Sequence, residues 1–456
     1  MQTPELITRL RKHLQSTVVG TDSPAYAAAR RVWNAAIDRR PAAIVRCEQA
    51  EDVALAVRIA ADQGLRVTVR GGGHNVAGRS VADAALLLDL SPMRAVAVNV
   101  PAQTAMVQGG ALWHDVDIAA AAHGLATTGG LVSSTGVGGL TLGGGSGWLM
   151  RRHGLAIDNL TAAGVVLSDG RFVRASESEY EDLFWALRGG AGGLGVVTSL
   201  EFRLHPLRLV WAGLIVHPAE EAGGALRAFR DFAAQSPDDF CGLAVLAHAP
   251  PLPFLDPSWY GRAVVIFAIC WCGEAAAAER ALAPLRGFGK PLADHVGPMP
   301  YVVWQHMQDA AAPAGRHHYW KTASFGVLSD AALDALAAAG NDLPTRATEI
   351  HVQHLGGAVA RVAATETAFA SRDAAFFVNL IGCTPWGEEF PMLRERVRAL
   401  HRQVAADGLS SALPNFTAED DGDIAAVMDG AQGSRLTSIR RRYDRTGLFS
   451  AAGIDG

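Results

Sequence analysis

The 456-residue sequence lacks the features that mark several large classes of protein. Its five cysteines are odd in number and scattered, so they match neither a disulfide framework nor the spacing of a zinc or iron–sulfur site. Forty basic residues stand against 45 acidic ones, without a basic patch that would favour nucleic acid. No apolar run approaches the ~20 residues of a membrane-spanning helix. These absences leave a globular chain long enough for more than one domain.

The first residues, MQTPELITRLRKHLQS, lack the apolar core of a signal peptide. Cys270 and Cys272 lie two apart in an apolar run, where a strand would place both on one face. Buried, unreactive thiols are the simplest interpretation of such a pair. We therefore expect a cytosolic, reduced protein that needs no metal and does not enter a membrane.

Glycine is the residue in excess, with 49 in the chain, roughly 11% against a usual ~7%. The excess is concentrated in three loops of the N-terminal half: GGGHN at 71–75, GVGGLTLGGGSG at 136–147 and GGAGGLG at 189–195. Successive glycines can turn their amides around phosphate oxygens and lie flat against a planar ring. One such loop is equally consistent with a tight turn. Three together indicate a long ligand with phosphates and an extended planar part.

The third loop contains a formal G-x-G-x-x-G in Gly190, Gly192 and Gly195. A dinucleotide fingerprint requires a strand before these glycines and a helix after them, so that the helix N-terminus meets the pyrophosphate. Here the order is reversed, because a helical pattern at 181–187 precedes the loop and a strand pattern at 196–204 follows it. The NAD-type interpretation is therefore rejected, and the sequence contains no triphosphate-binding loop either.

The hydrophobic pattern changes character after Pro206, where the glycine loops stop. Before it, the pattern predicts strands at 43–46 and 65–70 around a helix at 51–63, and Asp169-Gly170 predicts a hairpin over 164–173. After it, predicted helices alternate with apolar strands and predict a second, α+β domain over 207–408. The helices lie at 220–234, 275–285, 329–339 and 392–406, the strands at 263–271, 350–354 and 375–381, and a basic helix follows at 435–443.

Five segments in order along nearly the whole chain resemble the berberine bridge enzyme-like FAD-linked oxidases, of the vanillyl-alcohol oxidase (p-cresol methylhydroxylase) superfamily. They are RRPAAIVRC at 39–47, RGGGHN at 70–75, TTGGLVSSTGVGGLTLGGGSGWLMRRHGLAIDN at 127–159, DLFWALRGGAGGLGVVTSLEFRLHP at 182–206 and RLTSIRRRYDRTGLF at 435–449. The resemblance implies an α+β fold with a two-part FAD-binding domain, residues 1–206 joined by 409–456. Between these parts it implies an inserted substrate-binding domain, 207–408, built on an antiparallel sheet.

The resemblance also implies FAD held by a single covalent link, at His74. Many relatives have a second link through a cysteine, and Val132 occupies that position here. Thr135 matches the position facing the flavin edge that reacts with O2, although a threonine in such a turn could equally be a plain backbone hydrogen-bonder. The implied cofactor-binding residues are Arg70, Gly71, Gly72, Gly73, His74, Asn75, Val132, Thr135, Gly136, Gly138, Gly139, Leu140, Gly143, Gly144, Gly147, Val196 and Asn415.

Two positions depart from the family pattern. Gly193-Leu194 replaces a usual Asn-Phe, and Leu413 replaces a tyrosine that commonly acts on the substrate. The catalytic base must therefore be another group or none. In the predicted strand 350–354, Ile350 and Val352 would face the core, which turns His351 and Gln353 toward the pocket.

His351 is the leading candidate base, with a structural histidine as the alternative. Tyr319 and Lys321 lie in a segment, HHYWK, that resembles a stretch beside the family's pocket. An aromatic side chain there, Tyr319 or Trp320, could stack on a ring substrate, and the lysine could lower the pKa of a neighbour. Ordinary strand packing is equally compatible with both.

The sequence thus predicts an FAD-dependent oxidase that takes hydride from a small organic alcohol, amine or ring carbon. O2 would reoxidise the flavin and yield H2O2, in natural-product tailoring by family analogy. A carbohydrate or cyclic amine oxidase of the same fold, a dehydrogenase, and a flavin-binding protein with little O2 turnover are the alternatives. The expected partners are a small-molecule substrate and O2, and the sequence predicts no oligomeric state.

Overall fold

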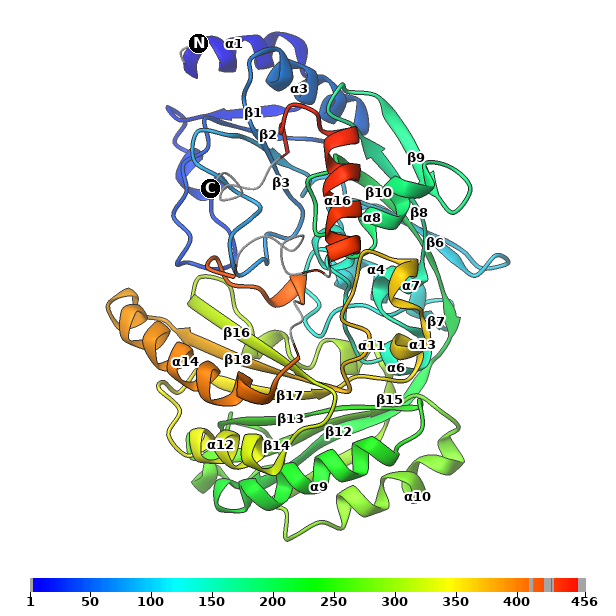
Figure 1. Ribbon diagram of the computed structural model, residues 1–456, viewed down its shortest axis with the longest axis vertical. Coiled ribbons are helices and arrows are strands. Elements are labelled where there is room, and N and C mark those ends of the chain that lie inside the picture. The colour runs from blue at the N-terminus through cyan, green and yellow to red at the C-terminus, as the bar shows by residue number, and fades with distance from the viewer. Residues whose placement is uncertain (1–2, 410–412, 422–427, 429, 450–456) are drawn as a thin grey trace.

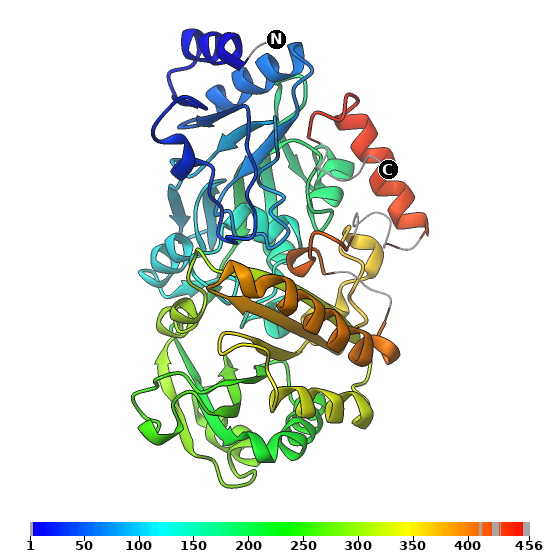
Figure 2. The same ribbon diagram turned by 90° about the vertical axis from the view of Figure 1, so that its left-hand side faces the viewer.

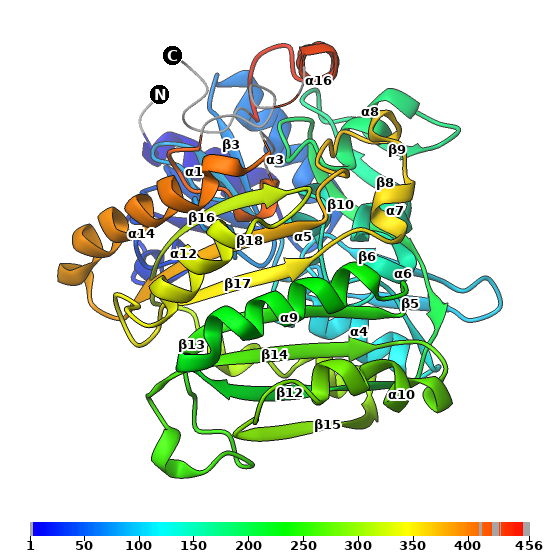
Figure 3. The same cartoon turned by 60° about the horizontal axis from the view of Figure 1, so that its bottom comes forward.

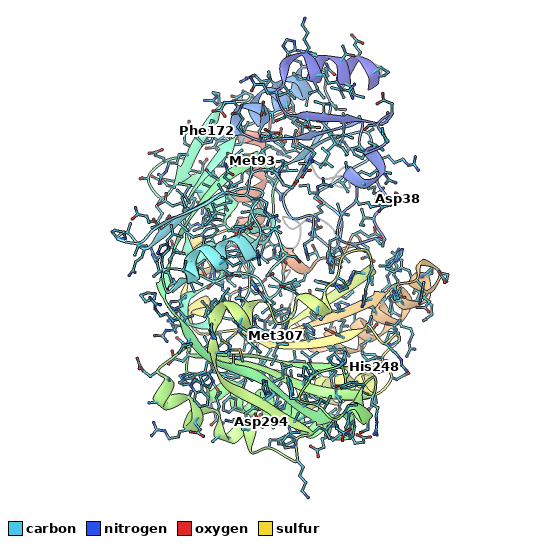
Figure 4. The ribbon with its side chains drawn as sticks, turned by 180° about the vertical axis from the view of Figure 1, so that it is seen from behind. Asp38, Met93, Phe172, His248, Asp294 and Met307 are labelled. Atoms are coloured by element: carbon cyan, nitrogen blue, oxygen red, sulfur yellow. The ribbon has the colours of Figure 1, made fainter. Side chains whose placement is uncertain are left out.

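The computed structural model describes residues 3–409, 413–421, 428 and 430–449. The molecule is elongated, with the N-terminal sheets at one end and a large sheet at the other (Figure 1). Seen from behind, Met93 lies in the first part and Asp294 in the second (Figure 4). The structure confirms the predicted α+β fold with an antiparallel sheet.

The first sheet has the strand order β1-β2-β4-β3. Its strands are β1 (Thr17–Gly20), β2 (Ala43–Arg46), β3 (Val67–Arg70) and β4 (Leu86–Asp89), of which β2, β4 and β3 run parallel. Helix α3 (Ala50–Asp62) packs on it because Val53, Ala56, Val57 and Ala60 form one apolar face. This confirms the predicted strand–helix–strand unit, whose last strand leads directly into the first glycine loop. Helices α1 (Thr3–His13) and α2 (Tyr26–Ala29) lie beside the sheet.

The second sheet is antiparallel, in the order β5-β6-β10-β8-β9. Its strands are β5 (Val96–Asn99), β6 (Thr104–Gln108), β8 (Leu160–Val166), β9 (Phe172–Ser176) and β10 (Val196–Arg203). Strands β8 and β9 form the hairpin predicted at Asp169-Gly170. Around this sheet lie α4 (Trp113–Ala121), α5 (Val137–Leu142), α6 (Met150–His153), α7 (Ala156–Asn159), α8 (Glu181–Leu187) and the short pair β7 (Leu125–Ala126) and β11 (His205–Pro206).

The third major sheet has seven antiparallel strands in the order β15-β12-β14-β13-β17-β18-β16. They are β12 (Leu209–Pro218), β13 (Phe240–His248), β14 (Ala263–Trp271), β15 (Ala293–Pro300), β16 (His317–Phe325), β17 (Glu349–His354) and β18 (Phe376–Thr384). Helices α9 (Ala222–Gln235), α10 (Ala275–Arg286), α12 (Asp330–Gly340) and α14 (Phe390–Val404) cover one face (Figure 3).

The opposite face of this sheet packs against the first part of the molecule, through α6, α7 and the short helix α11 (Tyr301–Gln305). Both faces are therefore buried, which explains why strands such as β14 are apolar almost without interruption. Because side chains alternate along a strand, each residue of β16, β17 and β18 faces either the helices or the first part. This parity decides which residues can reach a site between the two parts.

The C-terminal helix α16 (Gly430–Tyr443) returns to the first part and lies beside α8 (Figure 2). The Ser168 hydroxyl donates to the carbonyl of Tyr443 at 2.8 Å, and the amide of Val67 donates to the carbonyl of Leu448 at 2.8 Å. The last described residues thus bond to β3, the strand that leads into the first glycine loop. In the described part of the chain, no helix has both the length and the apolar character needed to cross a bilayer.

Candidate active site

A cavity of about 360 Å3 lies where the first part meets the seven-stranded sheet. Residues of all three glycine loops line one end of it. Side chains of β16, β17 and β18 line the other end, together with Trp33 and Phe416. The two ends are called here the loop end and the sheet end.

At the loop end, the first two glycine loops touch backbone to backbone. A Cβ atom on Gly72 would lie 2.4 Å from the Gly136 nitrogen, and one on Gly136 would lie 2.3 Å from the Gly72 nitrogen. Gly192 and Gly193 in the third loop have φ values of +104° and +77°, which other residues rarely adopt. The wall therefore consists of exposed main chain, as a ligand with phosphates and a flat ring requires.

Several polar groups at this wall are buried and have no hydrogen-bond partner within the described residues. They are the hydroxyls of Thr68, Ser80 and Ser146. A buried hydroxyl without a partner is costly, so such groups mark the places where a polar ligand binds. The glycine wall and these hydroxyls fit the phosphates, ribityl chain and ring of FAD.

His74 ends the first loop and lines the cavity. Its Nε2 lies 2.9 Å from the Ser134 hydroxyl, and its ring stacks on Trp33 with centroids 4.8 Å apart. Burial lowers the pKa of His74 to about 4, so the imidazole is neutral near pH 7. The ring is thus a fixed, neutral base whose Nδ1 is the nitrogen not held by Ser134.

A short N-terminal segment joins this loop to the sheet end. Trp33 stacks on His318 of β16 as well as on His74, with 4.0 Å between the Trp33 and His318 centroids. The Asn34 amide donates to the carbonyls of Val76 and His318 at 2.7 and 3.0 Å, and its oxygen accepts from the His318 amide at 2.9 Å. The distance between the His74 loop and β16 is fixed by these contacts.

The sheet end combines polar and aromatic side chains. His351 Nε2 lies 2.7 Å from a Glu349 carboxylate oxygen, and Asn379 is the cross-strand neighbour of His351. The Asn379 oxygen is buried without a hydrogen-bond partner among the described residues. Trp320 and Phe416 stack with centroids 6.1 Å apart. These side chains could hold a small organic molecule between an aromatic wall and hydrogen-bonding groups.

His351 is thus the candidate base that lies at the cavity, and the interpretation of the other three candidates is corrected. Gln353 points to the same side of β17 but is 1% exposed, beyond the cavity, among cross-strand neighbours Leu243 and Phe377. Tyr319 and Lys321 face the helices instead, because the intervening residue of β16, Trp320, faces the cavity.

Most of the implied cofactor-binding residues line the cavity. They are Gly71, Gly72, Gly73, His74, Asn75, Val132, Thr135, Gly136, Gly138, Gly139, Leu140, Gly143 and Asn415. Arg70 does not, because its guanidinium pairs with Asp89 at 2.8 Å and donates to the carbonyl of Ala29. Gly144 and Gly147 lie behind the wall, where a Cβ would meet Phe369 at 2.8 Å and the Gly129 carbonyl at 2.1 Å. Val196 is wholly buried in the apolar core.

At the two positions that depart from the family pattern, Gly193 lines the cavity and Leu194 is buried in the core. Leu413 is also buried, and Pro414 beside it lines the cavity. Sequence reasoning missed several lining residues. They are Trp33, Ser80, Gln308, His318, Glu349, Asn379 and Cys383.

The sequence contained a signal for some of the missed residues and none for others. Alternation along β17 and β18 places Glu349 and Asn379 on the His351 side, so the strand pattern contained that signal. Trp33 lies outside the described helices and strands, so no periodicity marks it. Gln308 follows α11 near Met307, where the two parts of the molecule meet (Figure 4).

Comparison with known proteins agrees with this geometry. A family profile described as an FAD binding domain matches residues 41–176. (R)-6-hydroxynicotine oxidase of Paenarthrobacter nicotinovorans is 29% identical over 450 residues, 96% of this chain and 95% of that protein.

Two solved structures extend the comparison to the whole fold. The crystal structure of 6-hydroxy-D-nicotine oxidase from Arthrobacter nicotinovorans is 27% identical, covers 96% of both chains and has a TM-score of 0.83. Physcomitrella patens BBE-like 1 is 20% identical, covers 100% of both chains and has a TM-score of 0.86, a likeness of fold.

The fold, the glycine-walled cavity and these similarities define an FAD-dependent oxidoreductase. The chain contains the FAD-binding domain of this class, is similar over nearly its whole length to 6-hydroxynicotine oxidase, and shares its fold with the berberine bridge enzyme-like proteins.

Proposed function

We propose that this protein is an oxidase that removes hydride from a small organic alcohol, amine or ring carbon, in the tailoring of natural products. The bound flavin would accept the hydride and pass its electrons to O2, giving H2O2. We propose residues 1–206 and 409–456 as the flavin domain and 207–408 as the substrate domain. The loop end would hold FAD and the sheet end the substrate.

The observation that carries this proposal is the position of two histidines at one cavity. His74 is a buried, neutral imidazole fixed by Ser134 and Trp33, which suits a single covalent link to the flavin. Val132 lines the same wall and has no atom that could form a second link. Thr135 also lines the wall, and we propose that its small side chain leaves room for O2.

His351 is proposed as the group that takes the proton from the substrate hydroxyl or amine. Because a carboxylate only accepts hydrogen bonds, Glu349 fixes the hydrogen on Nε2 of His351. The lone pair then lies on Nδ1, where it can accept a proton. Glu349 acts through His351 as a positioning residue, and Trp320 and Phe416 provide the wall against which a substrate ring could pack.

A cyclic amine oxidase is the second candidate, supported by one feature of the cavity. Among the described residues that line it, Glu349 is the one carboxylate and Arg79 the one Arg or Lys side chain. A carboxylate at the sheet end favours an amine over an anionic substrate. The similarity to (R)-6-hydroxynicotine oxidase points in the same direction. Peroxide release from a panel of amines, alcohols and oligosaccharides would separate these classes.

Acid denaturation of the purified protein tests the flavin site. If His74 forms the single link, yellow colour and fluorescence stay with the denatured wild-type chain and leave the chain in His74→Ala. Colour released from both proteins would exclude the covalent link, and a colourless protein would overturn the proposed function. Flavin that photoreduces but regains its colour in air over hours, with no peroxide from any substrate, would indicate a flavin-binding protein without oxidase turnover.

A further inference from the structure

Residues 413–421, called here the strap, pass around β16, the edge strand of the seven-stranded sheet. Ahead of the strap, the Leu409 amide donates to the carbonyl of Ser324 on β16 at 2.7 Å. The strap contacts the cavity side of the sheet near its start and the helix side near its end. Because successive side chains of a strand point to opposite faces, no single side chain of β16 reaches both. The strap does contact both faces, and it therefore connects them.

On the cavity side, the strap forms part of the cavity wall. The Asn415 amide nitrogen donates to the Leu140 carbonyl at 2.9 Å, and the Gly145 amide donates to the Asn415 oxygen at 2.9 Å. Phe416 stacks on Trp320 and packs on Phe377, with centroids 5.1 Å apart in the second pair. One residue of the strap thus holds the second glycine loop, and the next residue forms the aromatic wall.

On the helix side, Asp420 is the centre of a cluster of charged and polar groups. Its carboxylate accepts hydrogen bonds from the Tyr319 hydroxyl at 2.8 Å and from Arg398 of α14 at 2.7 Å, and Lys321 Nζ lies 3.0 Å away. Arg398 also donates to the Tyr319 oxygen at 2.9 Å, and Lys321 pairs with Asp421. Asp420, Tyr319, Lys321 and Arg398 are called here the anchor.

The anchor differs from an ordinary surface ion pair. One exposed pair contributes little to stability, because water and salt screen it. Here three donors converge on one carboxylate, and the Lys321 side chain is only 12% exposed, so the partners are fixed and partly desolvated. Burial raises the pKa of Asp420, but hydrogen bonds from Arg398, Tyr319 and Lys321 outweigh it and hold the pKa far below its usual value.

We propose that Tyr319, Lys321 and Arg398 are positioning residues that, through Asp420, hold the strap so that Asn415 and Phe416 complete the cavity. The anchor on the helix face of the sheet would then set the geometry of the second glycine loop on the opposite side. This role explains why a tyrosine and a lysine that face away from the cavity flank its tryptophan.

Amide hydrogen exchange of the purified, flavin-loaded protein tests this proposal, with the exchanged peptides fragmented to read Gly145. The primary variant is Arg398→Met. Its matched control is Arg396→Met, on the same helix, which loses an ion pair to Asp342 at 2.6 Å that does not touch the strap. Val265 of β14, which has a strand paired on either side, is the reference amide for global opening.

We expect exchange at Gly145 and in the strap to rise about tenfold in Arg398→Met, as local opening becomes easier. In Arg396→Met it should stay at the wild-type rate, and Val265 should be unchanged in both variants. Tyr319→Phe removes one hydroxyl and should give a smaller rise in exchange at the same amides. It replaces Arg398→Met as the test variant if Arg398→Met does not fold. Faster exchange in the strap alone, an equal rise in the control, or no rise would overturn the proposal. The measurement needs neither substrate nor turnover, so its outcome is independent of the proposed oxidase activity.

Discussion

The two ends of the cavity are built from different parts of the chain. The loop end is main chain, because Gly72 and Gly136 approach too closely for any Cβ. The sheet end is side chain, with Trp320, Glu349, His351 and Asn379 projecting from the three neighbouring strands β16, β17 and β18. A wall of main chain leaves a signature in the sequence, because only one residue type satisfies it. A wall of side chains depends on strand parity and on how far each strand extends past the cavity.

The largest effect is expected from breaking the main-chain wall. Gly72→Ala places a Cβ 2.4 Å from the Gly136 nitrogen, so the loops must separate. We expect a loss of about 3 kcal/mol in the free energy of unfolding and loss of bound flavin. Chemical unfolding and the flavin absorbance per chain measure both quantities.

Gly139→Ala is the matched control for the unfolding measurement. A Cβ there meets no atom within 4 Å, and the residue lies inside α5, where alanine stabilises a helix by up to about 1 kcal/mol relative to glycine. The control should unfold no earlier than the wild type. If Gly72→Ala were equally well tolerated, the contrast between the two ends would be wrong.

A smaller effect is expected from a single side chain at the sheet end. His351→Gln should keep its flavin but lose about a hundredfold in kcat/KM, the usual contribution of a positioned general base. Peroxide release with the best substrate of the panel measures it. The control is His317→Gln, on the helix side of β16, where His317 packs against Phe390. Equal losses in both variants, or none in His351→Gln, would remove His351 from the proposed chemistry.

The smallest expected effect is on the pH dependence of stability. Burial lowers the pKa of His318, at the cavity, and of His354, on the opposite face of the sheet, to about 3, against about 6.5 in an unfolded chain. Below pH 6.5 the unfolded chain therefore binds protons that the folded chain does not. When the pH falls from 7 to 6, each histidine should lower the free energy of unfolding by less than about 1 kcal/mol. Below pH 6, the loss for each further pH unit should be larger.

Urea unfolding at pH 7, 6 and 5 measures this slope, which should decrease in His354→Gln. Bound ligand should change the contribution of His318 and leave that of His354 unchanged, because only His318 lines the cavity. A slope that is the same in wild type and variant would show that His354 is protonated in the folded protein.

The sequence patterns predicted the loop end and the elements well. The helix at 181–187, the strand at 263–271 and the hairpin around Asp169-Gly170 agree with α8, β14 and the β8–β9 pair. Each was marked by local chemistry, either a period of 3.6 residues, an unbroken apolar run or a turn dipeptide. Such signals arise from neighbouring residues and do not depend on the rest of the fold.

The sheet end was predicted less well, for two physical reasons. The alternation of side chains along β17 correctly put Gln353 on the same side as His351. It could not show that Gln353 lies between its cross-strand neighbours Leu243 and Phe377, beyond the cavity. In β16 no alternation of apolar and polar residues marks a face, since His317, Tyr319 and Lys321 face the helices while His318 and Trp320 face the cavity. Trp33 depends on a contact between residues about 280 positions apart, which no local pattern encodes.

The course of the strap has a consequence for how the protein is made. A ribosome delivers the chain from its N-terminus, so the glycine loops and all seven strands of the large sheet emerge before Asn415, Phe416 and Asp420 do. Until then one wall of the cavity is missing and the second glycine loop lacks its contact with Asn415. The nascent protein thus passes through a stage with an open flank beside the loop end, through which a cofactor could load before the strap shuts it in.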